Sequence, residues 1–106
     1  KIDAKALRVP VPDGSITDLV ATVSEETSVE AVNEAFLRAA EGPLVGILRY
    51  TEESVVSTDI IGDPHSCIFD SEFTMVSGGR LVKIFGWYDN EWGYSSRLVD
   101  LVQKLG

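Results

Sequence analysis

With 106 residues, the chain can form one modest domain with a single hydrophobic core, and it is too short for two. Its 9 basic and 17 acidic residues give a formal net charge of −8, and the basic residues are scattered singly. Binding to nucleic acid or to an anionic membrane is therefore disfavoured, because no basic stripe is available to neutralise phosphates.

The amino terminus and the cysteine content bear on the compartment. The first ten residues, KIDAKALRVP, lack the apolar stretch and cleavage site of a signal peptide. No apolar run approaches the roughly 20 residues of a membrane-spanning helix. A single Cys excludes an intrachain disulfide, which suits a reducing compartment. We expect a soluble cytoplasmic protein, and the missing initial Met leads us to expect that Lys1 is not a natural start.

The first elements along the chain are two β-prone runs, at residues 4–9 and 15–23. Between them lies PVPDG, at residues 10–14, which is a strong turn signal. Gly accepts positive φ there, and Pro cannot donate to a strand ladder. The pattern predicts two antiparallel strands.

The next segment, TSVEAVNEAFLRAAEGP, predicts a helix. Thr27 stands three residues before Glu30, which is the spacing of a capping box. Apolar side chains then recur on one face at Val29, Val32, Phe36 and Ala39. Gly42 and Pro43 supply the stop signal.

Four short β-prone runs follow, at residues 46–51, 66–71, 73–77 and 80–88. Turn residues divide them, namely Gly62-Asp63-Pro64 and Gly78-Gly79. Several short strands with little helix between them favour an antiparallel or mixed sheet over a parallel one.

The last segment, DNEWGYSSRLVDLVQKLG, predicts an amphipathic helix. Asp89 is placed to cap it, and Glu91 falls in the first turn, where the helix dipole favours an anion. Its apolar stripe consists of Tyr94, Leu98, Leu101, Val102 and Leu105. The stripe needs a surface to pack against, so we expect a single α+β unit followed by this terminal helix.

His65 and Cys67 raise the question of a Cys/His nucleophile pair, because a thiolate needs a nearby base at neutral pH. Cys67 stands in a β-prone run where a small apolar residue is expected, so the structural interpretation is favoured. One Cys and one His cannot form a zinc centre alone. The carboxylates around the turns, Asp59, Asp63, Asp70 and Glu72, are predicted to be solvated turn residues.

Arg8 and Asn90 each have a structural and a functional interpretation. Arg8 can be a surface or ion-paired residue, or its guanidinium can bind phosphate oxygens in a bidentate manner. Asn90 can cap a helix, since Asn is a preferred cap. Its primary amide can also donate and accept at once, which makes it a good partner for another amide.

Three segments resemble the C-terminal part of phosphorylating glyceraldehyde-3-phosphate dehydrogenase and follow that family's order. They are LRVPVPDGSITDLV, EGPLVGILRYTEESVVSTDIIGDPHSCIFDS and WYDNEWGYSSRLVDL, and the resemblance covers residues 4–105. It implies that residues 1–88 form the C-terminal portion of the catalytic, substrate-binding domain, an antiparallel or mixed sheet with flanking helices. It also implies that residues 89–106 form a helix that packs on a nucleotide-binding domain.

The resemblance implies roles for individual residues as well. Asn90 matches the family residue that hydrogen-bonds the nicotinamide carboxamide, and Arg8 matches one that contacts substrate phosphate or inorganic phosphate. Tyr94 is similar to an aromatic residue that lines the nicotinamide pocket, and a packing role is nearly as well supported. Val11 stands where many relatives have Thr, a change we expect to leave Arg8 undisturbed.

The family oxidises glyceraldehyde 3-phosphate with NAD or NADP, through a thiohemiacetal and a thioester on a cysteine activated by histidine. Inorganic phosphate then releases 1,3-bisphosphoglycerate. The S-C-T-T-N segment with the nucleophile, the segment with the histidine and the Gly-rich dinucleotide loop are absent here, and Cys67 and His65 match neither catalytic residue. We therefore expect no catalytic residue and no metal site in this chain, and no activity from it alone.

Several alternatives stay open at this level. A relative that acts on erythrose 4-phosphate shares much of the pattern, and the preference between NAD and NADP is set in the absent domain. The family habit implies a homotetramer for the intact protein. A standalone interaction or structural module is a second hypothesis, and the sequence does not distinguish bacterial cytoplasm from plastid.

Overall fold

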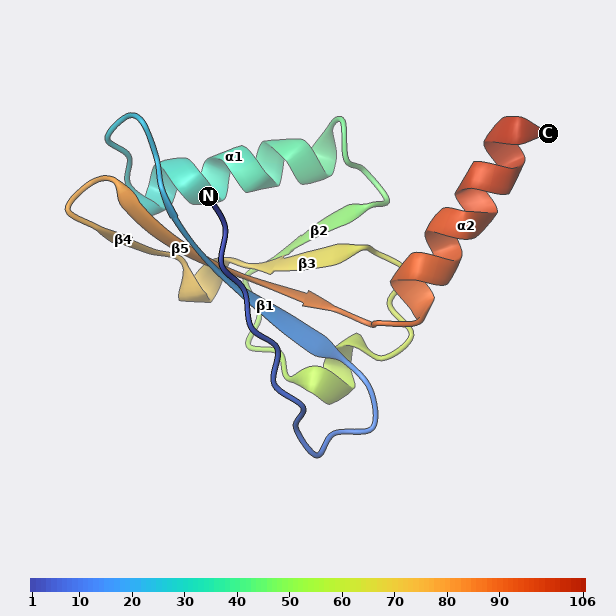
Figure 1. The fold of residues 1–106 in the computed structure, drawn as a ribbon. Coiled ribbons are helices and arrows are strands. Elements are labelled where there is room, and N and C mark those ends of the chain that lie inside the picture. Colours follow the sequence, from blue (N-terminus) through green and yellow to red (C-terminus); the bar gives the residue numbers. More distant parts are fainter.

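The computed structural model describes residues 1–106 and contains one five-stranded mixed sheet with two α-helices (Figure 1). The strands are β1 (Ser15–Thr22), β2 (Leu48–Thr51), β3 (Cys67–Asp70), β4 (Met75–Ser77) and β5 (Leu81–Tyr88). The helices are α1 (Val29–Glu41) and α2 (Trp92–Leu105), with short 3-10 helices η1 (Ser57–Ile60) and η2 (Ser71–Phe73). The predicted α+β class and the mixed sheet are confirmed.

Strand β5 organises the sheet, whose order is β1-β5-β3-β2. On one edge β5 pairs antiparallel with all of β1, from Ser15 opposite Tyr88 to Thr22 opposite Leu81. On its other edge it pairs first with β4 and then with β3, both antiparallel. Strands β2 and β3 are parallel because the connection through η1 returns the chain to the same end of the sheet.

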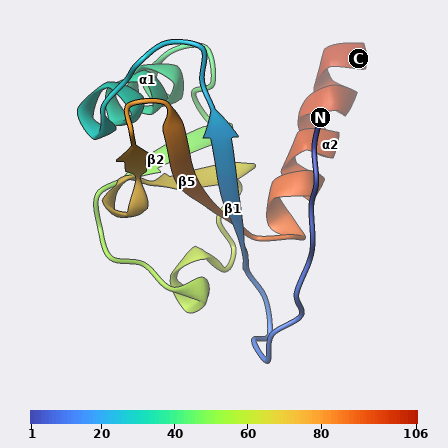
Figure 2. The same ribbon diagram turned by 60° about the vertical axis from the view of Figure 1, so that its left-hand side comes forward.

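Helix α1 covers part of one face of the sheet, with α2 standing apart from it (Figure 2). The ring of Phe36 stacks on that of Phe69 with centroids 4.0 Å apart, so the predicted apolar face of α1 does point to the sheet. The helix begins one residue later than the capping box indicated. The Ser28 hydroxyl accepts from the Ala31 N–H at 3.2 Å, and the helix ends at Gly42 as predicted.

The strand predicted at residues 4–9 does not form. Residues 1–8 make no backbone hydrogen bond, and the side chains of Ile2 and Leu7 are almost fully exposed. A strand needs a partner, and the turn at 10–14 does not fold this segment back onto β1, whose ladder is formed with β5 alone. An apolar β-prone run without a sheet edge beside it stays extended and solvated.

The core is small, since 11 of the 106 residues are buried. Its apolar members are Leu48, Ile60, Ile68, Phe69 and Val82. Many large apolar side chains lie outside it, on the amino-terminal segment, on β1 and along α2. The chain therefore presents apolar surface far beyond what its own core covers.

One close approach inside the sheet gives a test of the packing. A Cβ on Gly86 would lie 2.6 Å from the Cys67 sulfur, which is well inside van der Waals contact. We expect Gly86→Ala to lower the free energy of unfolding by about 1–3 kcal/mol through overpacking. The double variant with Cys67→Ala should recover most of that loss, because the obstructing sulfur is gone. Chemical denaturation followed by tryptophan fluorescence measures both, and additive losses would contradict this packing.

Candidate functional site at the start of α2

A buried carboxylate organises the junction between β5 and α2. Asp89 is 1% exposed, and its Oδ1 accepts hydrogen bonds from the N–H groups of Glu91 at 2.9 Å and Trp92 at 3.1 Å. Its Oδ2 accepts from the Gly62 N–H at 2.8 Å. As predicted, Asp89 binds N–H groups at the start of α2, those of Glu91 and Trp92, which lack helical partners; the N-cap position itself is held by Glu91, whose side chain makes no capping hydrogen bond. Because the helix begins at Trp92, Glu91 precedes the first turn instead of lying in it.

The hydrogen bonds decide the charge of Asp89. Burial alone would raise the pKa of this carboxyl group, but the N–H groups of Gly62, Glu91 and Trp92 outweigh it and lower the pKa to about 2. Asp89 is therefore ionised at neutral pH. Its contribution to stability is present above the ordinary value of 3.8 and is lost as the pH falls through 2.

Asn90 follows directly and is hydrogen-bonded to the start of β1, the strand that pairs with β5. Its Oδ1 accepts from the Gly14 N–H at 3.2 Å and from the Ser15 hydroxyl at 3.5 Å. Gly14 has φ of 94°, which only Gly adopts readily. The Asn90 side chain does not cap α2, so its capping interpretation is wrong. Its amide nitrogen makes no hydrogen bond within the chain and remains free to donate.

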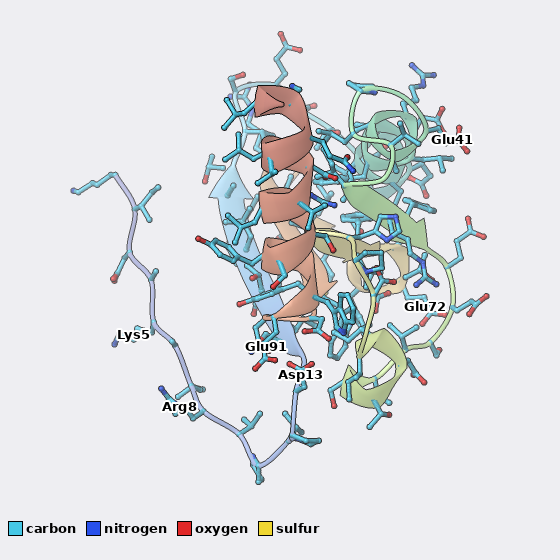
Figure 3. The ribbon with its side chains drawn as sticks, turned by 90° about the vertical axis from the view of Figure 1, so that its right-hand side faces the viewer. Lys5, Arg8, Asp13, Glu41, Glu72 and Glu91 are labelled. Carbon is cyan, nitrogen blue, oxygen red and sulfur yellow. The ribbon has the colours of Figure 1, made fainter.

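Arg8 lies on the extended amino-terminal segment, away from the start of α2 (Figure 3). It is exposed and makes no hydrogen bond or ion pair. The structure thus does not bring Arg8 and Asn90 together. The reason is the missing strand, because nothing in these residues fixes where the segment 1–9 runs.

Helix α2 touches the rest of the chain mainly through its first turns. Gly93 is buried against the loop after η1, where a Cβ would lie 2.8 Å from the His65 carbonyl oxygen. One turn later the Arg97 guanidinium donates to the Ser66 hydroxyl at 3.0 Å. Tyr94 is 70% exposed, and the predicted stripe of Leu98, Leu101, Val102 and Leu105 is bare as well. The helix stands on its amino-terminal end and leaves its apolar stripe uncovered.

The loop below α2 holds an ion-pair network that sequence reasoning missed. The Asp63 carboxylate binds the Arg49 guanidinium at 2.7 Å and the His65 ring at 2.6 Å. Burial raises the pKa of Asp63, but hydrogen bonds from His65 and Arg49 outweigh it and hold the pKa below its usual value. Asp63 is thus not a solvated turn residue. Because the His65 Nδ1 pairs with Asp63, this ring is engaged in the loop and makes no hydrogen bond with Cys67.

Strand β3 contains two further polar residues that burial affects, Asp70 and Cys67. Asp70 is fully buried, and it accepts from the Trp87 indole N–H at 3.0 Å, so its predicted solvation is also wrong. The sequence did contain one indication that Asp70 is buried, because it directly follows the apolar residues Ile68 and Phe69. Residue preferences for turns do not take such a position into account. Burial raises the pKa of the Cys67 thiol, so the thiol stays protonated at neutral pH, as expected of a structural Cys.

No group of three or more His, Cys, Asp or Glu side chains is arranged to hold a metal ion. Neither helix is long and apolar enough to cross a membrane.

Comparison with known proteins identifies the family. A sequence model described as glyceraldehyde 3-phosphate dehydrogenase, C-terminal domain, matches residues 1–90. The chain belongs to this dehydrogenase family. Glyceraldehyde-3-phosphate dehydrogenase 2 of Streptomyces avermitilis is 61% identical over 106 residues, which are 100% of this chain and 32% of the relative. The dehydrogenases of Streptomyces coelicolor and Mycobacterium avium are 60% and 57% identical over the whole chain, covering 32% and 31% of their own lengths.

The resemblance found in the sequence is therefore confirmed for the family and for its C-terminal domain. The chain spans about a third of the length of these dehydrogenases. The roles of Arg8, Asn90 and Tyr94 stay predictions, since the comparisons concern the family and not single residues.

The packing of α2 on the loop can be tested at Gly93. We expect Gly93→Ala to loosen the start of α2, because the added Cβ meets backbone, which cannot rotate away. Overpacking should cost about 1–3 kcal/mol and Ala gains roughly 1 kcal/mol in helix propensity, so we expect a net loss of up to about 2 kcal/mol in the free energy of unfolding. Hydrogen exchange of the α2 amides should accelerate. Ser95→Ala, at an exposed position of the same helix, is the matched control and should change exchange little.

Proposed function

We propose that this chain is the C-terminal third of a phosphorylating glyceraldehyde-3-phosphate dehydrogenase. The intact protein would oxidise glyceraldehyde 3-phosphate to 1,3-bisphosphoglycerate with NAD or NADP and inorganic phosphate, as a cytoplasmic homotetramer. The observation that carries this proposal is the match to the family's C-terminal domain over residues 1–90. Relatives about three times as long, with 57–61% identity over all of this chain, support it.

The exposed apolar side chains of residues 1–9 and of α2 support two separate packing roles within the intact protein. Residues 1–88 would complete the substrate-binding domain, and the bare segment 1–9 would gain its strand partners from the upstream part of that domain. Residues 89–106 would pack on the nucleotide-binding domain through the exposed stripe of α2. Burying an exposed side chain such as Leu98 or Val102 contributes about 1.5–3 kcal/mol, so packing of the stripe on that domain would be favourable.

Asn90 is the residue we assign to the cofactor. Its oxygen is occupied by Gly14 and Ser15, so its free amide nitrogen can donate to the carboxamide oxygen of a nicotinamide. A fixed donor at this point would select one rotation of the carboxamide and thus one face of the ring. The ring itself supplies the hydride acceptor, and this chain contributes orientation alone.

Arg8 is the residue we assign to phosphate. Its guanidinium is exposed and unpaired, and phosphate oxygens match its planar donor fork. The nucleophile has to come from the upstream part of the intact protein, because the only thiol here is half-buried with a raised pKa. The chain alone would therefore be inactive.

Variants of the intact dehydrogenase test both assignments. Asn90→Ala should raise KM for the nicotinamide cofactor roughly threefold to tenfold, because one neutral hydrogen bond is lost. Arg8→Ala should raise KM for glyceraldehyde 3-phosphate or inorganic phosphate by roughly 10- to 100-fold, because the lost bond is charge-assisted. Lys5→Ala, on the same exposed segment, is the matched control (Figure 3). Unchanged constants in the first two variants would remove both assignments.

The need for an upstream partner gives a second experiment. The purified 106-residue chain should not reduce NAD in the presence of glyceraldehyde 3-phosphate and phosphate. Co-expression with the upstream two thirds of a dehydrogenase such as that of Streptomyces avermitilis should yield a complex, visible by native mass spectrometry, that does. Activity with erythrose 4-phosphate in place of glyceraldehyde 3-phosphate would point to the alternative substrate.

The bare stripe of α2 also favours one non-enzymatic alternative, a standalone interaction module that captures a partner through Leu98, Val102 and Leu105. The same co-expression experiment separates the two. If the chain does not join the upstream part yet self-associates or binds a hydrophobic dye, the module is favoured over the dehydrogenase.

A further inference from the structure

The loop at residues 62–66, between η1 and β3, lies against the first turns of α2 (Figure 1). At its beginning, the Gly62 N–H donates to the Asp89 carboxylate at 2.8 Å. A Cβ on Gly93 would lie 2.8 Å from the His65 carbonyl oxygen, so the helix packs directly on the backbone of the loop. The position of α2 therefore depends on the shape of loop 62–66.

The last residue of loop 62–66 connects α2 to the sheet. The Arg97 guanidinium donates to the Ser66 hydroxyl at 3.0 Å. The Ser66 N–H donates to the Ile47 carbonyl oxygen, just before β2, at 2.8 Å. Both ends of the loop are thus fixed, with Gly62 bound at the start of α2 and Ser66 bound to both α2 and the sheet. The residues between them determine the shape of the loop.

Asp63 holds these middle residues in place. Its Oδ1 accepts from the His65 N–H at 2.9 Å and lies 2.6 Å from the His65 Nδ1. Its Oδ2 accepts from the Arg49 guanidinium on β2 at 2.7 Å. Pro64, between Asp63 and His65, has no N–H to contribute. The Asp63 side chain is only 10% exposed, so its carboxylate is the main link between the middle of the loop and the sheet.

Asn90 depends on this loop through its neighbour in the chain. Its side-chain oxygen is bound by the Gly14 N–H and the Ser15 hydroxyl. Its backbone is placed by the preceding residue, Asp89, whose carboxylate binds the Gly62 N–H on the loop. A displaced loop would therefore move the backbone of Asn90 and change the direction in which its free amide nitrogen points.

We propose that Asp63 is a positioning residue for the nicotinamide cofactor, because it fixes the loop that places the start of α2 and hence the Asn90 amide. Its bonds suit this role, since an ionised carboxylate with a guanidinium and an N–H forms bonds roughly twice as strong as neutral ones. The consequence for the cofactor rests on the function proposed above for Asn90. The control of α2 by Asp63 does not.

The first test uses the intact dehydrogenase with the substitution Asp63→Ala. The KM for the cofactor should rise roughly twofold to fivefold, less than in Asn90→Ala, because the Asn90 amide is still present but displaced. The KM for glyceraldehyde 3-phosphate should not change, because Arg8 lies on a separate segment (Figure 3). A loss of folded enzyme alone would lower the maximal rate and leave both KM values unchanged.

A double variant shows whether Asp63 acts through Asn90. Asp63→Ala combined with Asn90→Ala should have the cofactor KM of Asn90→Ala alone, because the group that Asp63 positions is gone. A KM raised by the product of the two single effects would mean that Asp63 affects the cofactor by another route. That result would overturn the inference.

Variants of the partner Arg49 provide a milder test that retains the bonds between Asp63 and His65. Arg49→Met removes the ion pair and should raise the cofactor KM in the same direction as Asp63→Ala. Arg49→Lys keeps a positive charge and a donor, so it should recover most of that change. These variants decide the question even if Asp63→Ala does not fold.

Hydrogen exchange followed by mass spectrometry reports the start of α2 independently of the cofactor. Exchange of the amides in residues 89–97 should accelerate by roughly tenfold in Asp63→Ala, because the loop under the helix loosens. Glu34→Ala is the matched control, since it removes an exposed ion pair with Arg38 on α1. It should change neither this exchange nor the KM values.

The outcomes separate this inference from the function proposed for Asn90. The inference is wrong if Asp63→Ala changes neither the exchange nor the cofactor KM. It is also wrong if Asn90→Ala raises the cofactor KM and Asp63→Ala does not. If exchange accelerates while the cofactor KM is the same in Asp63→Ala, Asn90→Ala and the unmodified enzyme, the control of α2 by Asp63 stands and the cofactor role of Asn90 is wrong.

Discussion

The buried carboxylate of Asp89 is the interaction on which the rest of this site depends. It stands between the last residue of the central strand and the first turn of α2, and its two oxygens bind N–H groups from the helix and from the loop after η1. Removing a buried acceptor would leave these N–H groups unpaired, at about 1–3 kcal/mol each. The single side chain therefore fixes the direction of α2, the position of the loop and the place of Asn90 together.

The sheet provides the second constraint. Strand β5 is hydrogen-bonded on both edges, so the positions of both ends of the β1–β5 pair are fixed. The end at Tyr88 and Ser15 is where the chain turns into α2, so residues 14 and 90 meet across 76 positions of sequence. Loop residues alone could not hold Asn90 in this way, since an exposed amide has many rotamers. A rigid antiparallel pair beneath it reduces them to one arrangement.

The sequence was sufficient for whatever depends on local pattern. The periodicity around Phe36, the stop at Gly42 and the alternation of short strands predicted α1 and the mixed sheet, and the binding of Asp89 to the start of α2 followed from residue type and position. What failed depends on partners. Residues 4–9 have β propensity, but no sheet edge lies beside them to pair with. Asp70 has the residue type of a turn, but in the fold it accepts a hydrogen bond from the distant Trp87 indole. The anchoring of Asn90 by Gly14 was likewise invisible, because no local rule connects residues so distant in sequence.

The distribution of apolar surface explains why the two candidate residues behave so differently. Asn90 sits where the chain's own contacts are complete, so its geometry is already defined in these 106 residues. Arg8 lies in a segment that makes no backbone hydrogen bonds through residue 8, with Leu7 and Val9 exposed on either side. A segment of this composition pays an entropic cost to become ordered and recovers it only by burying those side chains against another surface. If Arg8 binds phosphate as proposed, the site would therefore be assembled by the same packing that places the segment, whereas the Asn90 side chain is already held by Gly14 and Ser15 within these 106 residues.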